Sequence, residues 1–423
     1  MASETDNKSW RGLFGGKKGR LRKTMSSSDM ACRQKNELQG LYANNFNASW
    51  ERLCLIPRLP NDIAQHCLAK VPRVELTKLR LVCTSWKRLI ESKEFYRLRS
   101  EVGSAESWLL VLAENPTKTP FKAFCPRGNK WYKMPSVPNS SQTSLWQGFS
   151  CVAVGCKLLL MGGIYFDATP QECSSGVVCG DVYVYDASTN KWSKGTSMNT
   201  PRSWFAATAI GEYVYVAGGQ GKDRFLNSVE VYDTKQDSWS YVLSMRFVRA
   251  SCYGLALHGK LWVIGGEFVQ NRCGDKLERG SAEVYDPFTG FWSVIPEMWL
   301  DTQKVPGPGT VHCGKLLFVH QSKLMMYEDE RNRWCHVGYL PGGELYSNRF
   351  SRFGFAFESV ENELYIVGGM RISRQHRYSL QSLNTTEVCK ISYKQTFKCT
   401  DWRTVVSMGD CEGNVLASAV LRF

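Results

Sequence analysis

Two short patterns recur along the second part of this chain, and they constrain its fold more than any other feature. In the first, an aromatic residue stands seven positions before a tryptophan, with turn-forming residues between them. The five pairs are Phe124 and Trp131, Tyr185 and Trp192, Tyr232 and Trp239, Tyr285 and Trp292, and Tyr327 and Trp334. In the second, two glycines close an apolar run, at Leu158–Gly163, Tyr213–Gly219, Leu261–Gly266 and Leu364–Gly369. Both patterns predict strands that end in tight turns, so the chain is expected to repeat one small β unit.

The repeated units indicate a propeller. A strand that ends in two glycines and is followed by a Tyr-Asp pair and a tryptophan resembles a kelch repeat, which forms one four-stranded blade. Six such units follow one another in residues 107–423. The fifth has Val319-His320 in place of the glycines, and the sixth has Cys389 in place of tyrosine and an insertion before Trp402. The expected fold is therefore mainly β, a six-bladed kelch β-propeller.

The two ends of the repeat region predict how such a ring closes. The first unit opens on Trp108–Leu112, the strand that would normally carry the glycine pair, and so lacks an innermost strand. The chain finishes with one strand too many, Asn414–Leu421. We expect this last strand to enter the first blade, which closes the propeller and removes its exposed sheet edges.

Residues 53–99 carry a different, helical pattern. Pro60-Asn61-Asp62 can start a helix, and the apolar residues that follow recur at helical spacing until Pro72 interrupts them. A second helical pattern runs from Leu76 to Ile90. Short helices over so few residues cannot bury all of this apolar surface, so part of it is expected to await a partner.

This helical segment resembles an F-box. The family motif begins with Leu-Pro and an acidic residue, here Leu59-Pro60-Asn61-Asp62, and continues to a Leu-Arg-x-Val-Cys-x-x-Trp run, here Leu79–Trp86. The resemblance implies a small all-α domain that docks a Skp adaptor and, through it, a cullin. The residues implied at or behind that docking face are Leu59, Pro60, Ile63, Leu68, Val82 and Trp86. For each of them, contact with the adaptor and packing inside the domain remain equally open.

The net charge of +14 does not by itself indicate nucleic-acid binding. Residues 1–106 hold 20 Lys and Arg against 11 Asp and Glu, and the remaining 317 residues hold 33 against 28. The excess is concentrated in one cluster at Lys17–Lys23, within a Gly-, Ser- and Asn-rich segment at 1–50 that is expected to be a disordered basic arm. The cluster is interpreted either as a solvated tail or as a nuclear import signal.

Sixteen cysteines would suit a disulfide scaffold only in a short secreted chain. Here many lie inside apolar strands, such as Cys151, Cys252 and Cys389, and are expected to be reduced core residues. The sequence has neither a run of 18 apolar residues nor the apolar core of a signal peptide. A location in the cytoplasm, the nucleus or both is expected, with no membrane and no nucleic acid among the partners.

Sequence motifs of catalysis are missing. The six histidines show no metal-ligand spacing with each other or with the cysteines, and there is no P-loop, nucleophile elbow or dinucleotide fingerprint. The run Gly218-Gly219-Gln220-Gly221 resembles a phosphate loop but closes a propeller strand. The chain is therefore expected to be no enzyme and to need neither a metal nor a cofactor.

A target-binding face is expected where the long connections lie, at residues 164–180, 267–280 and 370–384, because long loops on a rigid scaffold often carry function. Sixteen positions before the first glycine of each pair stands Trp146 or an arginine, with Gln303 at the matching place in the fifth unit. This register is expected to begin each innermost strand, at the channel mouth. The predicted target-binding residues are Trp146, Arg202, Arg249, Gln303, Arg352, Arg371, Arg374 and Arg377.

Two interpretations of these arginines stay open. Guanidinium groups at the channel mouth would suit an acidic or phosphorylated target segment. Alternatively, one arginine recurs because each blade uses it for internal hydrogen bonds.

The order of basic arm, F-box and kelch repeats is similar to that of the F-box/kelch-repeat family, which is abundant in plants. The resemblance implies the substrate-recognition subunit of an SCF-type E3 ubiquitin ligase, in which the propeller captures a protein for ubiquitination and proteasomal degradation. A kelch scaffold or cytoskeletal binding protein without a ubiquitin role is the main alternative. A propeller oxidase is a remote one, because no secretion signal or ligand set supports it.

Overall fold

The structure is a computed structural model, and it describes eleven segments of the chain. They are residues 54–113, 121–138, 144–167, 176–266, 280–299, 307–320, 322–341, 350–373, 379–391, 401–409 and 411–423. The expected basic arm at 1–50, including Lys17–Lys23, lies outside them. The chain divides into two compact units, residues 1–65 and 66–423. None of the described helices is long and apolar enough to span a membrane.

Four short helices precede the sheets. They are α2 (Asn61–Ala69), α3 (Arg73–Leu79), α4 (Thr84–Ile90) and α5 (Lys93–Glu101). Local chemistry sets their starts: Pro72 stands before α3, the Cys83 sulfur accepts the Trp86 N–H at α4, and the Ser92 hydroxyl accepts the Phe95 N–H at 3.2 Å at α5. In the second unit, α3 to α5 bury Leu76, Ile90 and Phe95 in a shared core.

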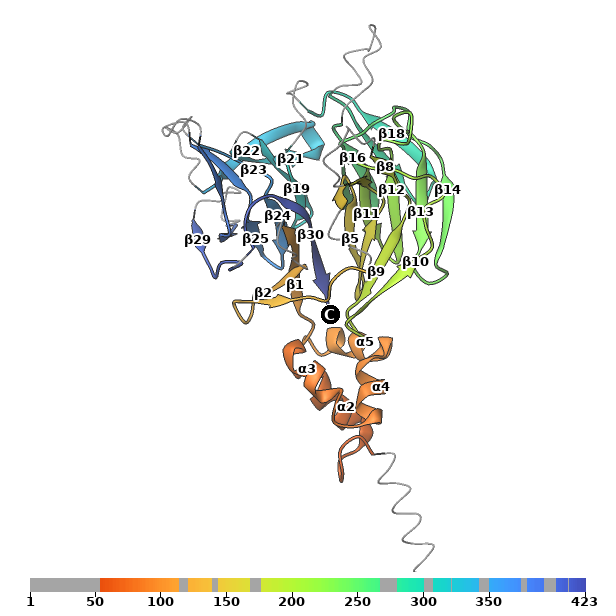
Figure 1. The fold of residues 1–423 in the computed structure, drawn as a ribbon, viewed down its shortest axis with the longest axis vertical. Helices are drawn as coiled ribbons and strands as arrows, with labels where there is room; N and C mark the ends of the chain where they lie inside the picture. Colours follow the sequence, from red (N-terminus) through yellow and green to blue (C-terminus); the bar gives the residue numbers. More distant parts are fainter. Residues whose placement is uncertain are drawn as a thin grey trace, which may run out of the picture. The chain divides into compact units, whose positions relative to one another are not determined.

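The rest of the second unit is β structure, and its described residues form six four-stranded sheets (Figure 1). Sheet 1 contains β1 (Ser107–Ala113), β2 (Lys122–Cys125), β3 (Lys130–Lys133) and β30 (Val415–Arg422). Sheet 2 contains β5 (Ser150–Val154), β6 (Lys157–Met161), β9 (Val182–Asp186) and β10 (Lys191–Gly195). Sheet 3 contains β11 (Ala206–Ile210), β12 (Tyr213–Ala217), β13 (Val229–Asp233) and β14 (Ser238–Val242).

The remaining sheets follow the same order along the chain. Sheet 4 contains β15 (Tyr253–Leu257), β16 (Lys260–Ile264), β17 (Ala282–Asp286) and β18 (Phe291–Ile295). Sheet 5 contains β19 (Gly309–His312), β20 (Lys315–His320), β21 (Lys323–Glu328) and, after the short 3-10 helix η1 (Asp329–Arg331), β22 (Arg333–Tyr339). Sheet 6 contains β24 (Ala356–Val360), β25 (Glu363–Val367), β28 (Thr386–Lys390) and β29 (Trp402–Thr404).

Two further sheets, each of three strands, interrupt this order. One consists of β4 (Ser144–Gln147), β7 (Ile164–Asp167) and β8 (Val177–Val178) and belongs to the connections of sheet 2. The other consists of β23 (Phe350–Phe353), β26 (Met370–Ser373) and β27 (Ser379–Ser382) and belongs to the connections of sheet 6. Parts of the stretches that the sequence suggested were irregular, 164–180 and 370–384, are therefore strands.

The aromatic residue and the tryptophan are seven positions apart because they lie opposite each other across a hairpin. Each of the five pairs faces across the outer two strands of its sheet, as Tyr232 faces Trp239. The paired rings lie 4.9 to 5.4 Å apart between centroids, within the range of favourable aromatic contacts. In sheet 6, Cys389 faces Trp402 in the same way. The predicted hairpins are confirmed.

The same tryptophans join each sheet to the one before it. The indole N–H of Trp239 in sheet 3 donates to the Thr196 carbonyl, just beyond the outer strand of sheet 2, at 2.9 Å. Equivalent bonds of 2.5 to 3.1 Å leave the other five sheets, and that of Trp131 in sheet 1 reaches the Val406 carbonyl beyond β29 of sheet 6. Six indole bonds therefore connect the six sheets in one cycle.

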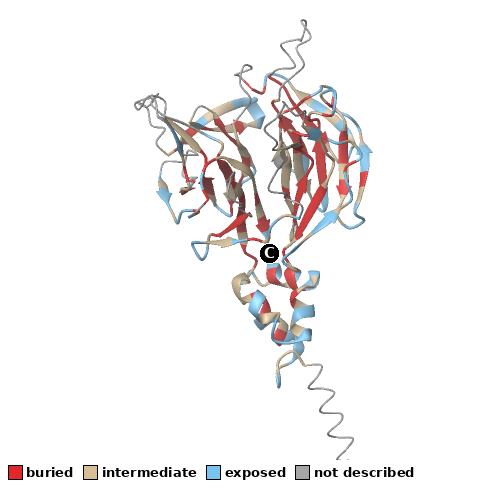
Figure 2. Ribbon diagram, viewed as in Figure 1, coloured by how far each residue is buried: buried red, intermediate tan, exposed pale blue. Residues whose placement is uncertain are grey.

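The innermost strands of the sheets also follow one another in a cycle. We call β5, β11, β15, β19, β24 and β30 the inner strands. Each contacts the next in this order, and β30 contacts β5. As expected from the ends of the repeat region, β30 pairs with β1, from Ser107 opposite Arg422 to Ala113 opposite Val415. Buried residues gather along the middle strands of the sheets (Figure 2).

The glycine pairs mark places where the connection to the next sheet passes very close. Gly218 has φ +66°, and a methyl group there would come within 2.5 Å of the Arg249 carbonyl oxygen on the way into sheet 4. The N–H of the neighbouring Gly219 donates to that same oxygen at 2.7 Å. Only glycine combines this backbone conformation with this approach, which explains the recurring pair.

Cysteines mostly agree with the expectation of reduced thiols in the strands. Cys151 and Cys252 are free. Burial raises the pKa of the Cys252 thiol to about 11, so the thiol stays protonated at neutral pH and is a poor nucleophile. Cys389 is disulfide-bonded, and for this residue the prediction of a reduced thiol is wrong.

Replacing Gly218 by alanine tests the close approach of the sheets. Gly211→Ala is the control, because Gly211 has φ +62° but open space around it. We expect Gly211→Ala to lower the free energy of unfolding by about 1 kcal/mol, from the left-handed backbone alone. Gly218→Ala should cost about 2 kcal/mol more, because the methyl group displaces the Arg249 carbonyl. Equal losses in thermal or urea unfolding would show that the sheets do not pack this closely.

Candidate functional site

The first unit holds three of the residues implied to contact an adaptor. Ile63 lies on α2 with 47% of its surface exposed. Pro60, just before that helix, is also exposed, and Leu59 is half-buried. An exposed isoleucine next to an exposed proline is the type of surface that a protein partner covers.

The other three residues belong to the second unit and differ in burial. Leu68 is only 3% exposed and packs in the helical core, so it is a core residue. Trp86 is half-buried against that core. Val82 is 61% exposed, and its neighbour Leu81, which the sequence analysis did not select, is 86% exposed. Leu81 and Val82 together form an apolar tip between α3 and α4.

The exposure of this tip follows from where α3 ends. Helical spacing placed Val82 on one face with Leu76 and Leu79, but α3 stops at Leu79. Arg80 caps the helix, and Leu81 and Val82 lie in the following turn, where neither side chain has a core to enter. Two consecutive apolar residues after a helix end are therefore the signal that identifies Leu81.

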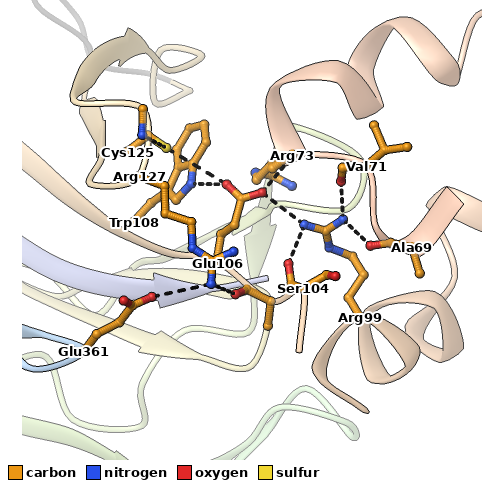
Figure 3. A network of polar contacts seen from close by, with 12 residues as sticks. Ala69, Val71, Arg73, Arg99, Ser104, Glu106, Trp108, Cys125, Arg127 and Glu361 are labelled. Carbon is orange, nitrogen blue, oxygen red and sulfur yellow. Dashed lines mark hydrogen bonds and ion pairs between the residues drawn. The ribbon is translucent and has the colours of Figure 1, made fainter. Parts of the chain in front are cut away.

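A buried ion pair joins α5 to sheet 1 (Figure 3). The Arg99 guanidinium is fully buried; it donates to the carbonyl oxygens of Ala69 at 2.8 Å and Val71 at 2.6 Å, and to the Glu106 carboxylate at 3.2 Å. Burial lowers the pKa of Arg99, and Glu106 is the main group that opposes this effect. Arg99 thus ties three chain segments together around one carboxylate.

Glu106 receives further donors from both sides of the junction. Its carboxylate accepts the Arg73 backbone N–H at 2.8 Å, from the first residue of α3, and the Trp108 indole N–H at 2.9 Å, from β1. Figure 3 shows the carboxylate lying between the Trp108 ring and the Arg99 guanidinium. A buried charge with this many partners is well satisfied, so the α3–α5 segment is held in one position on sheet 1.

Two arginines of the helical segment also bond to sheet 2. The Arg73 guanidinium donates to the Ala187 carbonyl at 2.8 Å and stacks on the Phe423 ring at 3.7 Å. The Arg80 guanidinium forms an ion pair with Glu91 and donates to the Thr189 carbonyl at 3.2 Å. Sequence reasoning missed these contacts, because their partners lie 109 and 114 positions away and no periodic pattern links them.

The spacing of sixteen residues before the first glycine of each pair reflects a hydrogen bond. These residues lie at the ends of the sheets that are away from helices α3 to α5. The guanidinium groups of Arg202, Arg249 and Arg352 donate to the carbonyls of Gly218, Gly265 and Gly368, the first glycines of their own sheets, at 2.6 to 3.0 Å. In sheet 2, the indole N–H of Trp146 donates to the Gly162 carbonyl at 2.9 Å in the same way. Each of these residues lies four positions before its inner strand, not at the start of the strand as expected.

Each arginine of this register is also paired with a carboxylate of its own sheet. Arg202 meets Glu230 at 2.6 Å, Arg249 meets Glu283 at 3.0 Å and Arg352 meets Glu387 at 2.8 Å.

The side chains of Arg202, Arg249 and both of their partners are 0% exposed, and that of Arg352 is 5% exposed. The expected open cationic centre is therefore not formed by these three residues, because burial and pairing use their charge inside the sheets. The structure supports the alternative of internal packing.

Trp146 and Arg352 occupy equivalent places on the two three-stranded sheets, as do Tyr165 and Arg371. Trp146 of β4 faces Tyr165 of β7, and Arg352 of β23 faces Arg371 of β26. Trp146 is half-buried and stacks with Phe149 and Tyr165, at 4.2 and 5.5 Å between centroids. Arg371 is half-buried as well. Gln303, Arg374 and Arg377 lie outside the described residues, as does most of the stretch 267–280.

Comparison with family models separates the chain into two recognisable parts. A model described as F-box domain matches residues 56–98. A model described as KLHDC2/KLHL20/DRC7 Kelch-repeats domain matches residues 121–328. The first match contains the apolar tip and the second contains sheets 2 to 4 in full.

Whole-chain comparison finds relatives with both parts. Three F-box/kelch-repeat proteins of Arabidopsis thaliana are similar to this chain over most of its length. The first is 28% identical and aligns with 79% of this chain and 89% of its own length. The second is 32% identical and aligns with 76% of this chain and 81% of its own length. The third is 28% identical and aligns with 87% of this chain and 86% of its own length.

Arg249→Ala tests the structural role of the register arginines. Removing the guanidinium leaves Glu283 buried without its charge partner, so we expect the free energy of unfolding to fall by about 3 to 5 kcal/mol. Arg246→Ala is the control: Arg246 is exposed, and only its backbone N–H contacts Glu283, at 2.6 Å. This control should stay within about 0.5 kcal/mol of the parent in thermal unfolding. A stable Arg249→Ala protein would return the arginine to the list of residues free to bind a target.

Glu106→Gln tests the junction. The amide keeps the shape of the carboxylate but leaves the Arg99 charge buried without its ion-pair partner, so we expect a loss of at least about 2 kcal/mol. Hydrogen exchange at the backbone amides of α5 should accelerate with it. Glu101→Gln, at an exposed position on α5, should change neither measurement. Unchanged exchange in α5 would contradict the clamping role of Glu106.

Proposed function

Because this chain belongs to the family of F-box/kelch-repeat proteins, we propose that it is the substrate-recognition subunit of an SCF-type E3 ubiquitin ligase. The F-box docks a Skp adaptor, which links the chain to a cullin. The β unit captures a target protein for ubiquitination and proteasomal degradation. The chain performs no chemistry itself, since transfer of ubiquitin belongs to the associated enzymes.

The observation that carries this proposal is the exposed apolar surface within the F-box match. Leu81 and Val82 expose 86% and 61% of their surface in the turn after α3, and Ile63 exposes 47%. Adjacent, strongly exposed aliphatic side chains on a small helical module indicate a protein interface. We assign the adaptor contact to Leu81 and Val82 in the second unit and, as a separate candidate contact, to Ile63 and Pro60 in the first unit, and a core role to Leu68.

The architecture of the β unit supports the role of target receptor. We propose that sheets 1 to 6 are the six blades of one closed kelch propeller, with β30 completing the first blade. The cycle of inner-strand contacts and the cycle of indole bonds both support this closure. A rigid ring can present the connections of sheets 2 and 6, which carry the two three-stranded sheets, to a target.

The target face proposed here differs from the one expected from the sequence. Trp146, Tyr165 and Arg371 replace Arg202, Arg249 and Arg352 as the described residues that such a face can offer. An acidic or phosphorylated segment remains a proposal that depends on Arg371 among them. We further propose that the protein acts in the cytoplasm, the nucleus or both, where ligases of this type assemble.

Substitution of the apolar tip tests the proposal directly. In a Leu81→Asp/Val82→Asp variant, carboxylates replace the side chains that the adaptor would bury, so affinity for a purified Skp adaptor should fall by at least about tenfold. Isothermal titration calorimetry of the full chain measures this affinity. In cell extract, the same variant should lose the cullin that the parent recovers.

Phe288→Asp is the matched control, because Phe288 is 98% exposed on the hairpin between β17 and β18. It should bind adaptor like the parent. A folded parent that binds neither the adaptor nor a cullin would refute the ligase role and favour the alternative, a kelch-repeat scaffold or cytoskeletal binding protein. Equal adaptor binding by the tip variant and the parent would refute the assigned surface.

A further inference from the structure

A cavity of about 500 Å³ lies among the six inner strands. All six strands contribute lining residues, many of them small, such as Ala153, Ala207, Gly254 and Ala417. The volume falls within the range of sites that hold small organic molecules, about 300 to 1,000 Å³. The lining contains neither the apolar tip nor the proposed target-face residues Trp146, Tyr165 and Arg371, although Phe149 of the lining stacks on Trp146.

The charge of this cavity is concentrated on one residue. Among the described residues that line it, Glu358 of β24 alone carries a charged side chain. Aromatic residues, including Phe149, Phe205 and Phe355, form part of the remaining lining. The cavity thus combines a single carboxylate with neutral and aromatic walls.

Glu358 has no cationic partner among the described residues. One of its oxygens accepts the hydroxyl of Ser418, on the neighbouring inner strand β30, at 2.7 Å. By contrast, the buried carboxylates Glu230, Glu283 and Glu387 each meet an arginine. The protein therefore neutralises its other buried carboxylates of this region but leaves Glu358 exposed to the cavity without a counter-charge.

This arrangement is costly for the protein alone. Removal from bulk water disfavours a carboxylate and raises the pKa of Glu358 to about 7, and the Ser418 hydrogen bond only partly offsets this. A cation in the cavity would lower the pKa again, because it stabilises the charged form. Ligand binding and ionisation of Glu358 are therefore expected to be linked.

The elements packed against β24 supply no other group that titrates near neutral pH and faces Glu358. Tyr365 of β25 lies directly opposite, and its hydroxyl donates to Glu363. His312 of β19 shares a hydrogen bond with Ser359, on the other side of β24, and β1 contains no ionisable residue. The Cys151 thiol of β5 interacts electrostatically with Glu358, but burial raises the pKa of Cys151 far above neutrality.

From the cavity volume, its neutral aromatic walls and its single unpaired carboxylate, we propose that the inner-strand cavity binds a small organic cation, with Glu358 as the ion-pair partner and Ser418 holding the carboxylate. Phenylalanine rings add cation–π attraction to such a ligand. A divalent metal is a poorer fit, because it needs several oxygen ligands, and the described residues contain no group of three or more His, Cys, Asp or Glu side chains that could hold one.

Matched probes test the charge requirement on the full chain. Phenethylamine and choline are the cationic probes, and phenethyl alcohol and dimethylbutanol are their neutral counterparts of the same shape. Isothermal titration calorimetry and thermal shift measure binding to the parent, to Glu358→Gln and to the control Glu361→Gln. Glu361 is exposed on the turn after β24 and lies outside the cavity lining. Glu358→Gln should fold normally, since glutamine still accepts the Ser418 hydroxyl and removes a poorly solvated charge.

We expect each cationic probe to bind the parent and Glu361→Gln at least about tenfold more tightly than its neutral counterpart, and Glu358→Gln to lose this preference. At pH 7, binding to the parent should release about half a proton per cation, measured as a dependence of the enthalpy on the buffer, and binding to Glu358→Gln none.

Three results would overturn the proposal: no binding of either cation, equal binding of cations and neutral probes, or an unchanged preference in Glu358→Gln.

Discussion

Neighbouring sheets of this protein have separate backbone ladders, and, besides the indole bonds, hydrogen bonds at the glycine pairs join sheet 2 to sheet 3 and sheet 3 to sheet 4. The carbonyl of Arg249 accepts the N–H of Gly219 at 2.7 Å from sheet 3, while its guanidinium binds Gly265 and Glu283 of sheet 4. Arg202 joins sheet 2 to sheet 3 in the same way. Because each arginine is buried and paired with a glutamate, its charge is not available at the surface. Other side chains therefore have to recognise a target protein.

A second set of charged side chains attaches the helical segment α3–α5 to sheets 1 and 2. Arg99 and Glu106 are buried at the point where α5 runs into sheet 1; the Arg99 guanidinium donates to several backbone carbonyls, and the Glu106 carboxylate accepts the backbone N–H of Arg73. Arg73 and Arg80 extend the attachment to sheet 2. Because these contacts lie on two different sheets, the segment from α3 to α5 cannot pivot without breaking the Arg99–Glu106 ion pair or the hydrogen bonds of Arg73 and Arg80 to sheet 2. The apolar tip is thereby coupled mechanically to the β unit.

Features with a fixed spacing could be predicted from the sequence, and features with a variable spacing could not. The seven-residue hairpins and the sixteen-residue register are constant because each repeats one local geometry. The carboxylate partners of the register arginines stand 28, 34 and 35 positions away, since connections of different length lie between them, so no pattern reveals them. Without the partners, an arginine at the sheet ends looked available for binding. The end of α3 at Leu79 was missed because the apolar spacing continues beyond it, and Glu358 was missed because a single glutamate in a strand carries no signal.

The pairing of β30 with β1 has a consequence for how the molecule is made. Ser107 and Arg422 face each other although more than 300 residues separate them in the chain. During synthesis, sheet 1 has to wait with an open edge until residues 415–422 have left the ribosome, while sheets 2 to 6 can each form as soon as their own four strands emerge. Such an open edge is a template for wrong strand pairing. The pairing of β30 with β1 is therefore the last to form, and the chain is most exposed to aggregation during the time before it forms. Protection by chaperones during that time would matter more than the stability of any single sheet.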